Sequence, residues 1–219
     1  MSFASELLRA GVLDGVRVLH VAPASALARE GSTASAVRAA CTELGASVWS
    51  VEAHGDGDEA EQEQRVDQAV ADALASAGGA ELAVIDAGAL LAAAESAAAE
   101  LEQHERARVA LAGTLQSTWV ATRAVVTRGF IEREGAARII YITPAAGGGE
   151  HSDAARAGLE NLARTLSIEW ARYAITLVAL APAASTAAGE VAALCAYLAS
   201  PAGAYFSGCE LDLSGPAAN

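Results

Sequence analysis

The sequence predicts one α/β domain in which helices cover both faces of a parallel, doubly wound sheet. Short apolar runs rich in Val and Ile alternate with segments whose apolar residues recur at helical spacing. The runs are almost continuously apolar, which is typical of parallel strands covered on both faces. Composition changes nowhere in a way that indicates a second domain, so residues 1–219 are expected to fold as one unit.

The expected elements follow each other as strand and helix, joined by right-handed crossovers. Ser32 is expected to cap a helix that ends at Leu44, with Gly45 after it, and Gly78-Gly79 is expected to end a second helix. The expected strands are 16–22, 47–52, 82–85, 138–143, 175–180 and 209–213. The expected helices are 32–44, one that carries 66–74, a long region from about 92 to 131, 152–172 and 190–198, with 54–64 as a solvated loop running into the second of them.

Composition and charge restrict the classes of partner. The net charge of −13 argues against nucleic acid and anionic membranes, which need clustered Lys and Arg. Cys41, Cys195 and Cys209 lie far apart without a CxxC pair, so we expect small buried side chains and no metal site. Without a signal-peptide pattern or a long uncharged apolar stretch, the expected location is the cytoplasm.

Several segments resemble the short-chain dehydrogenase/reductase (SDR) superfamily. Residues 156–182 resemble its signature helix, following strand and proline turn almost position for position. Further similar segments are 136–146, 84–88, 114–119 and 207–215. The resemblance implies a Rossmann-like, doubly wound parallel sheet in a single domain of SDR type. Because only 183–189 separate Pro182 from the next expected helix, the substrate lid of the family is expected to be deleted.

The resemblance also implies where the catalytic tetrad would lie. Ser152 falls on the tyrosine position and Arg156 on the lysine position, while Pro144 falls on the serine position and Thr114 on the asparagine position. A serine hydroxyl is much less acidic than a phenol and has a shorter reach, and a guanidinium is no compact ammonium. We therefore expect a degenerate member of the family with no catalytic residues at these positions. Tyr141 is expected to pack within its strand.

The cofactor end departs from the family pattern in the same way. A Rossmann turn needs glycines so that the pyrophosphate can approach a helix N-terminus, but between Val21 and Ala36 the only glycine is Gly31. The weak candidates for cofactor binding are Glu52, Gly88 and Arg156. We expect no cofactor, and NAD or NADP if one binds.

Two tempting motifs have plainer interpretations. His151-Ser152-Asp153 names the residues of a hydrolase triad, but consecutive helical residues diverge, so helix capping by Ser152 or Asp153 is expected instead. Gly147-Gly148-Gly149 lacks the Lys-Ser/Thr of a phosphate-binding loop and is expected to be a flexible loop. The four histidines have no ligand spacing.

The features that the chain keeps favour assembly. In the resembled family the helices at 114–131 and 152–172 form a dimer interface, and the last strand supports a tetramer. The leading hypothesis is an inactive subunit that assembles with an active SDR paralogue and supports or regulates it. Two alternatives stay open: an atypical NAD(P)-dependent oxidoreductase, and a non-redox homo-oligomeric binding or scaffold protein.

Overall fold

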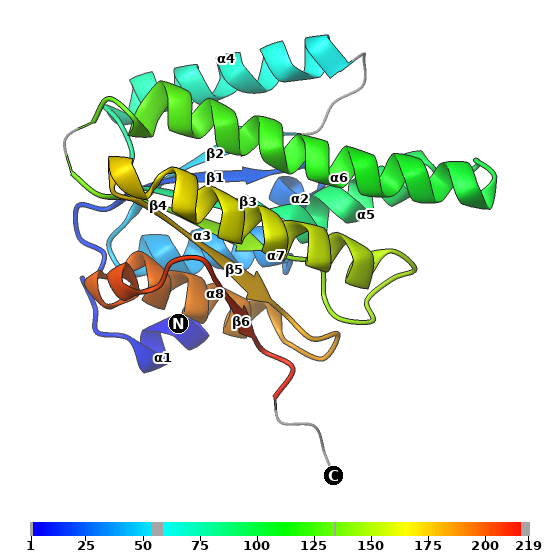
Figure 1. Cartoon of the computed structure of the whole chain (residues 1–219). Helices are drawn as coiled ribbons and strands as arrows, with labels where there is room; N and C mark the ends of the chain where they lie inside the picture. Colours follow the sequence, from blue (N-terminus) through cyan, green and yellow to red (C-terminus); the bar gives the residue numbers. More distant parts are fainter. Residues whose placement is uncertain (1, 54–58, 134, 216–219) are drawn as a thin grey trace.

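A six-stranded parallel sheet forms the centre of the molecule. The computed structural model describes residues 2–53, 59–133 and 135–215. The strand order is β2-β1-β3-β4-β5-β6 (Figure 1). The strands are β1 (Arg17–Ala22), β2 (Ser47–Glu52), β3 (Leu82–Asp86), β4 (Ala137–Ile142), β5 (Ile175–Ala181) and β6 (Cys209–Asp212). The predicted fold class is therefore confirmed, and each strand lies within one residue of its predicted bounds.

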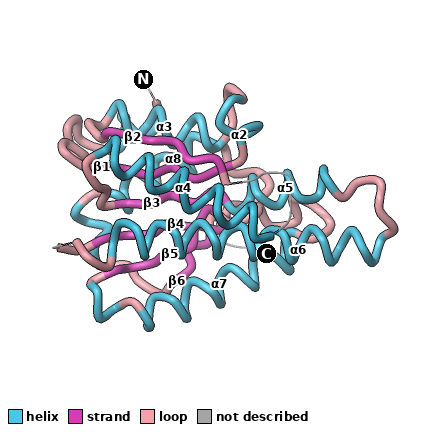
Figure 2. The backbone as a smooth tube through the Cα atoms, turned by 90° about the horizontal axis from the view of Figure 1, so that it is seen from above, coloured by secondary structure: helices cyan, strands magenta, loops and turns pink. Residues whose placement is uncertain are grey.

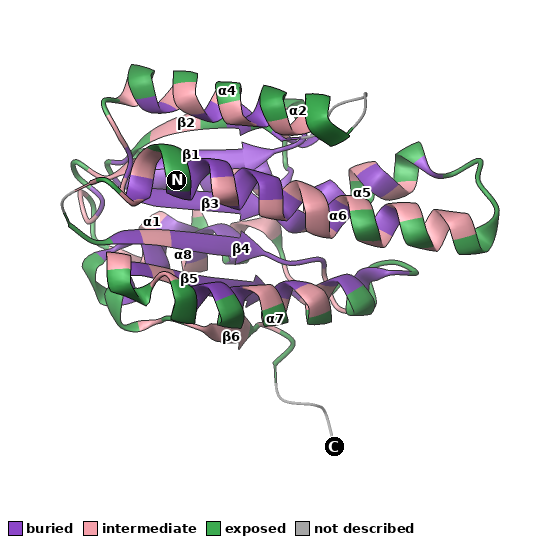
Figure 3. Cartoon of the chain, turned by 45° about the horizontal axis from the view of Figure 1, so that its top comes forward, coloured by how far each residue is buried: buried purple, intermediate pink, exposed green. Residues whose placement is uncertain are grey.

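Helices cover both faces of this sheet and form a three-layer structure. The helices α4 (Glu59–Ala77), α6 (Gln103–Val125) and α7 (Ser152–Glu169) pack on one face, where Leu19 and Val21 of β1 point. The helices α1 (Phe3–Leu7), α3 (Thr33–Glu43) and α8 (Ala188–Ala199) pack on the other, where Val18 points. The central strands β1, β3, β4 and β5 are buried on both faces, whereas the edge strands β2 and β6 are partly exposed (Figure 3). This double cover explains why the strands read as continuous apolar runs.

The strand order reverses direction between β1 and β3, because β1 pairs in parallel with both β2 and β3. In the usual dinucleotide-binding order, three strands precede this reversal; here there are two, so β2 is the edge of the described sheet. Ligands of open α/β sheets bind outside the carboxyl ends of the strands at such a reversal.

The long region predicted from about 92 to 131 is helical in the structure, but it is not continuous. The structure has two helices there, α5 (Ala87–Ala97) and α6, followed by a π-helical turn at Val126–Phe130. Alanine favours helix everywhere in this region, so its runs do not mark the break. The two helices run beside each other and project beyond the carboxyl ends of the strands (Figure 2). Helix 152–172 also ends early, at Glu169, before a 3-10 turn at Ala171–Tyr173.

Two short helices escaped prediction. They are α1 and α2 (Ala24–Ala28), and α2 lies where a loop was expected. The predicted loop over 54–64 is wrong from Glu59 onward, where α4 begins, and its first residues lie outside the described chain. Ser32 caps α3 as predicted, with its side chain accepting from the Ser35 amide, and Gly45 follows the helix at a φ of +106°. Within the described residues, none of the helices is both long and apolar enough to span a membrane.

Candidate functional site

A crevice of about 290 Å³ opens at the carboxyl ends of the central strands. Its walls come from the α2–α3 connection, the first turns of α5, the segments that follow β4 and β5, and the start of α7. The crevice lies at the strand-order reversal, where the fold places ligands. Its charged groups are Arg29, Asp86 and Glu95.

On the β1 side, α2 and the start of α3 form the wall of the crevice. Ala26 of α2 packs with Ala22 and Ala34 in a small apolar cluster. The Ser32 hydroxyl donates to the Ala26 carbonyl at 2.8 Å and accepts from the Ser35 amide at 3.0 Å. Ser32 thus caps one amide of the first turn of α3 from within the chain, while Ser32 and Thr33 stay in the crevice wall.

On the β3 side, α5 begins at the residue after the strand ends. Asp86 is 3% exposed, and its Oδ1 accepts from the Ala89 amide at 2.9 Å. Burial raises the pKa of this carboxyl to about 6. A Cβ on Gly88 would lie 3.2 Å from the Thr143 carbonyl oxygen, so glycine lets α5 start against the segment after β4. Within 84–88, one of the segments similar to the family, the strand end passes directly into a helix.

The structure brings only some of the tetrad positions together. Pro144 and Ser152 both line the crevice, and Ser152 is the first residue of α7 and 4% exposed. Thr114 is buried inside α6, where its hydroxyl donates to the Ala110 carbonyl at 2.7 Å. Thr143, which precedes Pro144, donates its hydroxyl to the Leu180 carbonyl at 3.1 Å.

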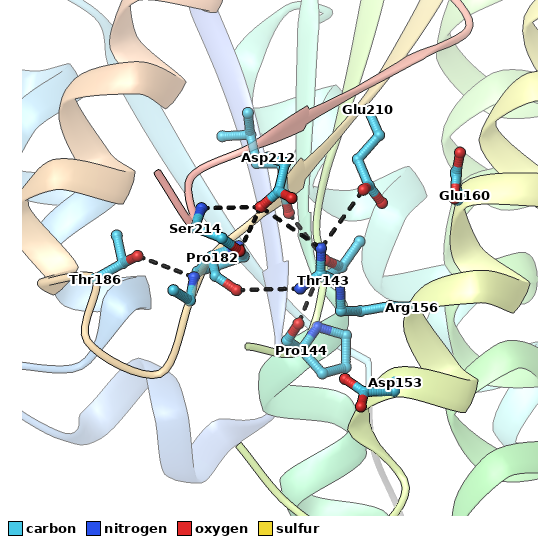
Figure 4. Close-up of polar contacts among 12 residues, drawn as sticks. Thr143, Pro144, Asp153, Arg156, Glu160, Pro182, Thr186, Glu210, Asp212 and Ser214 are labelled. Atoms are coloured by element: carbon cyan, nitrogen blue, oxygen red, sulfur yellow. Dashed lines mark hydrogen bonds and ion pairs between the residues drawn. The ribbon is translucent and has the colours of Figure 1, made fainter. Parts of the chain in front are cut away.

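Arg156 lies outside the crevice wall and points toward β6 (Figure 4). Its Nη2 lies 3.5 Å from a carboxylate oxygen of Glu210 and 3.8 Å from one of Asp212. Its Nη1 donates to the Pro182 carbonyl at 3.5 Å. The side chain is 12% exposed, so this ion pair is largely covered and joins α7 to the last strand.

Of the remaining cofactor candidates, Gly88 lines the crevice and Glu52 does not. Glu52 is an exposed residue at the end of β2, in register with Ala22 of β1. Sequence reasoning missed Arg29 and Glu95. Glu95 lies two helical turns beyond Gly88 on the same face of α5, a relation that becomes visible only when the start of α5 is known.

The capping prediction for the His151-Ser152-Asp153 motif is wrong. His151 occupies the N-cap of α7, and no side chain caps the helix. Asp153 instead accepts from the Gly147 amide at 3.2 Å and so fixes one end of the glycine loop. No hydrogen bond joins these three side chains to one another within the described chain.

Tyr141 packs inside the core, as predicted. Its hydroxyl lies 2.8 Å from the Thr122 Oγ1, and burial raises its pKa further above the ordinary range of a phenol. Among the described residues no group of three or more His, Cys, Asp or Glu side chains is arranged to hold a metal ion.

The family model described as short chain dehydrogenase matches residues 9–193. The chain therefore belongs to the short-chain dehydrogenase family, in agreement with its fold and with the place of its crevice. No curated protein matches the sequence.

Solved structures of dehydrogenases share the fold. A short chain dehydrogenase from Mycobacterium smegmatis is 24% identical with a TM-score of 0.73, covering 95% of each chain. A citronellol catabolism dehydrogenase from Pseudomonas aeruginosa is 24% identical with a TM-score of 0.70, covering 94% of this chain and 96% of that one. A 3-ketoacyl-(acyl-carrier-protein) reductase from Brucella melitensis, complexed with NADH, is 19% identical with a TM-score of 0.68, covering 92% and 97%.

Proposed function

We propose that this chain is a catalytically inactive SDR-like subunit that assembles with an active dehydrogenase paralogue in the cytoplasm and supports or regulates it. The observation that carries the proposal is the pair of residues at the acid/base positions. Ser152 has neither the acidity nor the reach of a phenol. Arg156 pairs with Glu210 and Asp212 and does not line the crevice, so no positive charge reaches it from the lysine position.

The residues at the crevice do not fit NAD or NADP. A dinucleotide needs a close backbone approach to the N-terminus of the first long helix. In this chain α2 packs beside that approach, and the Ser32 side chain bonds to the Ala26 carbonyl and the Ser35 amide, so the Ser35 amide is not free for a phosphate. The buried Asp86 adds a carboxyl group to the same wall. No step of the proposed function therefore uses a nicotinamide.

Assembly through residues 114–131 and 152–172 is supported by the outer surface of α6 and α7. Trp119 and Trp170 stack with ring centroids 6.4 Å apart, and both are only half-buried. Ile168, near the end of α7, is 78% exposed. Aromatic and aliphatic side chains of this kind are typical of the centre of a protein interface.

Co-purification from the native host tests the assembly. We expect an intact dehydrogenase to accompany the wild-type chain, and to be lost from Ile168→Asp but retained by Glu160→Lys, a charge change on an exposed ion pair of the same helix. A chain that is recovered only as a homo-oligomer would contradict the proposal.

Calorimetry tests the absence of cofactor. NAD, NADH, NADP and NADPH are titrated into the purified protein at up to ~1 mM, a concentration that detects binding of about −4 kcal/mol. We expect no heat of binding. Saturable binding of any of the four would overturn the proposal and favour an atypical oxidoreductase.

A non-redox binding protein is the second candidate. The observation that favours it is the crevice itself, which has open space and is lined by Glu95, whose Oε1 has no partner among the described residues. A stable homo-oligomer that binds a small molecule and captures no dehydrogenase would support this candidate over the first.

A further inference from the structure

We infer that the crevice binds a small zwitterionic molecule that carries both a carboxylate and an ammonium group, as an α-amino acid does. The inference rests on the proposal that no dinucleotide occupies the crevice, and it adds the chemistry of the ligand. It follows from the volume of the cavity and from unpaired groups of opposite charge at its walls.

The size of the cavity suits such a molecule. About 290 Å³ corresponds to roughly ten water molecules at ~30 Å³ each. The face of α5 that lines it is mostly small, with Gly88, Ala89 and Ala92 between Asp86 and Glu95. A metabolite of amino-acid size fits this space, whereas a dinucleotide is several times larger.

One end of the crevice supplies an acceptor for an ammonium group. The Oε1 of Glu95 is fully covered and has no hydrogen-bond partner within the described chain. A Cβ built on Gly149 would meet both Glu95 Oε2, at 3.5 Å, and the Ser152 hydroxyl, at 3.3 Å, so these two side chains flank one point. An unsatisfied buried acceptor is costly, and an ammonium donor would satisfy it.

Arg29 supplies the opposite charge. Arg29 lines the same cavity from its exposed rim and forms no salt bridge with any described residue, although its charge is near enough to attract the carboxyl of Asp86. A guanidinium binds a carboxylate through two parallel hydrogen bonds. Because Arg29 and Glu95 do not neutralise each other, a ligand that touches both carries a negative group toward Arg29 and a positive group toward Glu95.

Asp86 lines the same crevice as Arg29 and Glu95. Asp86 is only 3% exposed. Among the described residues its Oδ1 accepts a hydrogen bond from the Ala89 amide, and its Oδ2 has no hydrogen bond. Its second oxygen is an acceptor on the same wall. A wall with a carboxyl group disfavours phosphates and dicarboxylates, and it leaves Arg29 as the cation that selects a single carboxylate.

Thermal shift and calorimetry with the common α-amino acids, each at ~10 mM, test the inference, since this concentration stabilises a protein even when the Kd is ~1 mM. We expect at least one amino acid to bind saturably. The amine that lacks its carboxylate and the acid that lacks its amine are expected to bind at least roughly tenfold more weakly, because each loses one charged contact.

Variants locate the site. Glu95→Gln and Arg29→Gln are expected to weaken the amino acid at least roughly tenfold, while the exposed matched controls Glu100→Gln and Arg9→Gln leave its Kd unchanged. Stability of each variant without ligand shows that it is folded. No binding by any amino acid, or equal loss in the controls, would overturn the inference and leave the inactive-subunit proposal standing. Binding of NAD(P) in the separate titration would overturn that proposal instead.

Discussion

The two sides of the crevice treat their polar groups in opposite ways. On the β1 side, Ser32 bonds to the Ala26 carbonyl and the Ser35 amide, so the start of α3 is satisfied internally. On the side between α5 and α7, the Oε1 of Glu95 is covered and unpaired within the described chain. The difference teaches that the chain pairs its own polar groups at the start of α3, while the neighbouring wall keeps a carboxylate oxygen without a partner in the described residues.

A larger side chain in α2, on the β1 side of the crevice, is expected to have the largest effect. Ala26 is 4% exposed and packs against Ala22 and Ala34, so Ala26→Leu should reduce the free energy of unfolding by about 2–3 kcal/mol. Urea unfolding measures it, with Ala24→Leu as the exposed control on the same helix. A change in unfolding free energy near zero would mean that α2 is loosely packed against Ala22 and Ala34 and can move aside.

Asp86, in the crevice wall, makes the stability of the fold depend on pH. Its pKa is raised from 3.8 to about 6 in the folded protein, so the folded state holds this proton more tightly than the unfolded state. Stability contributed by this group is therefore present below about pH 4 and is lost as the pH rises to about 6.

Asp86→Asn keeps an acceptor for the Ala89 amide and removes this titration. The stability of the variant relative to wild type should rise by about 2 kcal/mol between pH 4 and pH 6. Urea unfolding across this range measures the difference. Parallel curves for the two proteins would show that water or a movement of α5 already solvates the carboxyl.

Arg156 tests whether its ion pair with Glu210 stabilises the fold. Arg156→Met removes the partner of Glu210, whose side chain is only 19% exposed, so unfolding should become easier by about 1–2 kcal/mol. Arg164→Met, which breaks an exposed pair with Glu160 on the same helix, should cost about 0.3 kcal/mol. Amino-acid binding should be the same in both variants; a selective loss in Arg156→Met would place this residue at the ligand.

The smallest effect is expected at the cap of α3. Ser32→Ala removes the acceptor of the Ser35 amide and should cost about 1 kcal/mol of unfolding free energy. Ser76→Ala, which removes a serine hydroxyl bonded within α4, is the control and should cost less. If Ser32→Ala instead created saturable binding of inorganic phosphate, the Ser32 side chain alone would prevent an anion from binding at the N-terminus of α3.

Much of the fold could be predicted because its signals are local. Strands covered on both faces give apolar runs such as 138–143, and Ser32 with Gly45 marks both ends of α3. The break between α5 and α6 could not be predicted, because alanines on both sides of 98–102 give no contrast in helix propensity. For the same reason α2, also rich in alanine, could not be distinguished from the residues around it.

The site was predicted in part, for a different reason. Gly88, Pro144 and Ser152 were found through the family resemblance, which fixes their place along the chain, and all three line the crevice. The partners of Arg156 were out of reach, since Glu210 lies on another strand 54 residues away. Glu95 also escaped, because its face is defined only once α5 is known to start at Ala87.

The direct passage from β3 into α5 has a mechanical consequence. With no loop between Asp86 and Ala87, the sheet sets the direction of α5, which is about 16 Å long at ~1.5 Å per residue. A tilt of ~5° at this junction would move the far end by about 1.4 Å, taking the neighbouring end of α6 with it. A small change at the Asp86–Ala87 junction, in the wall of the crevice, would therefore move the far ends of α5 and α6 together.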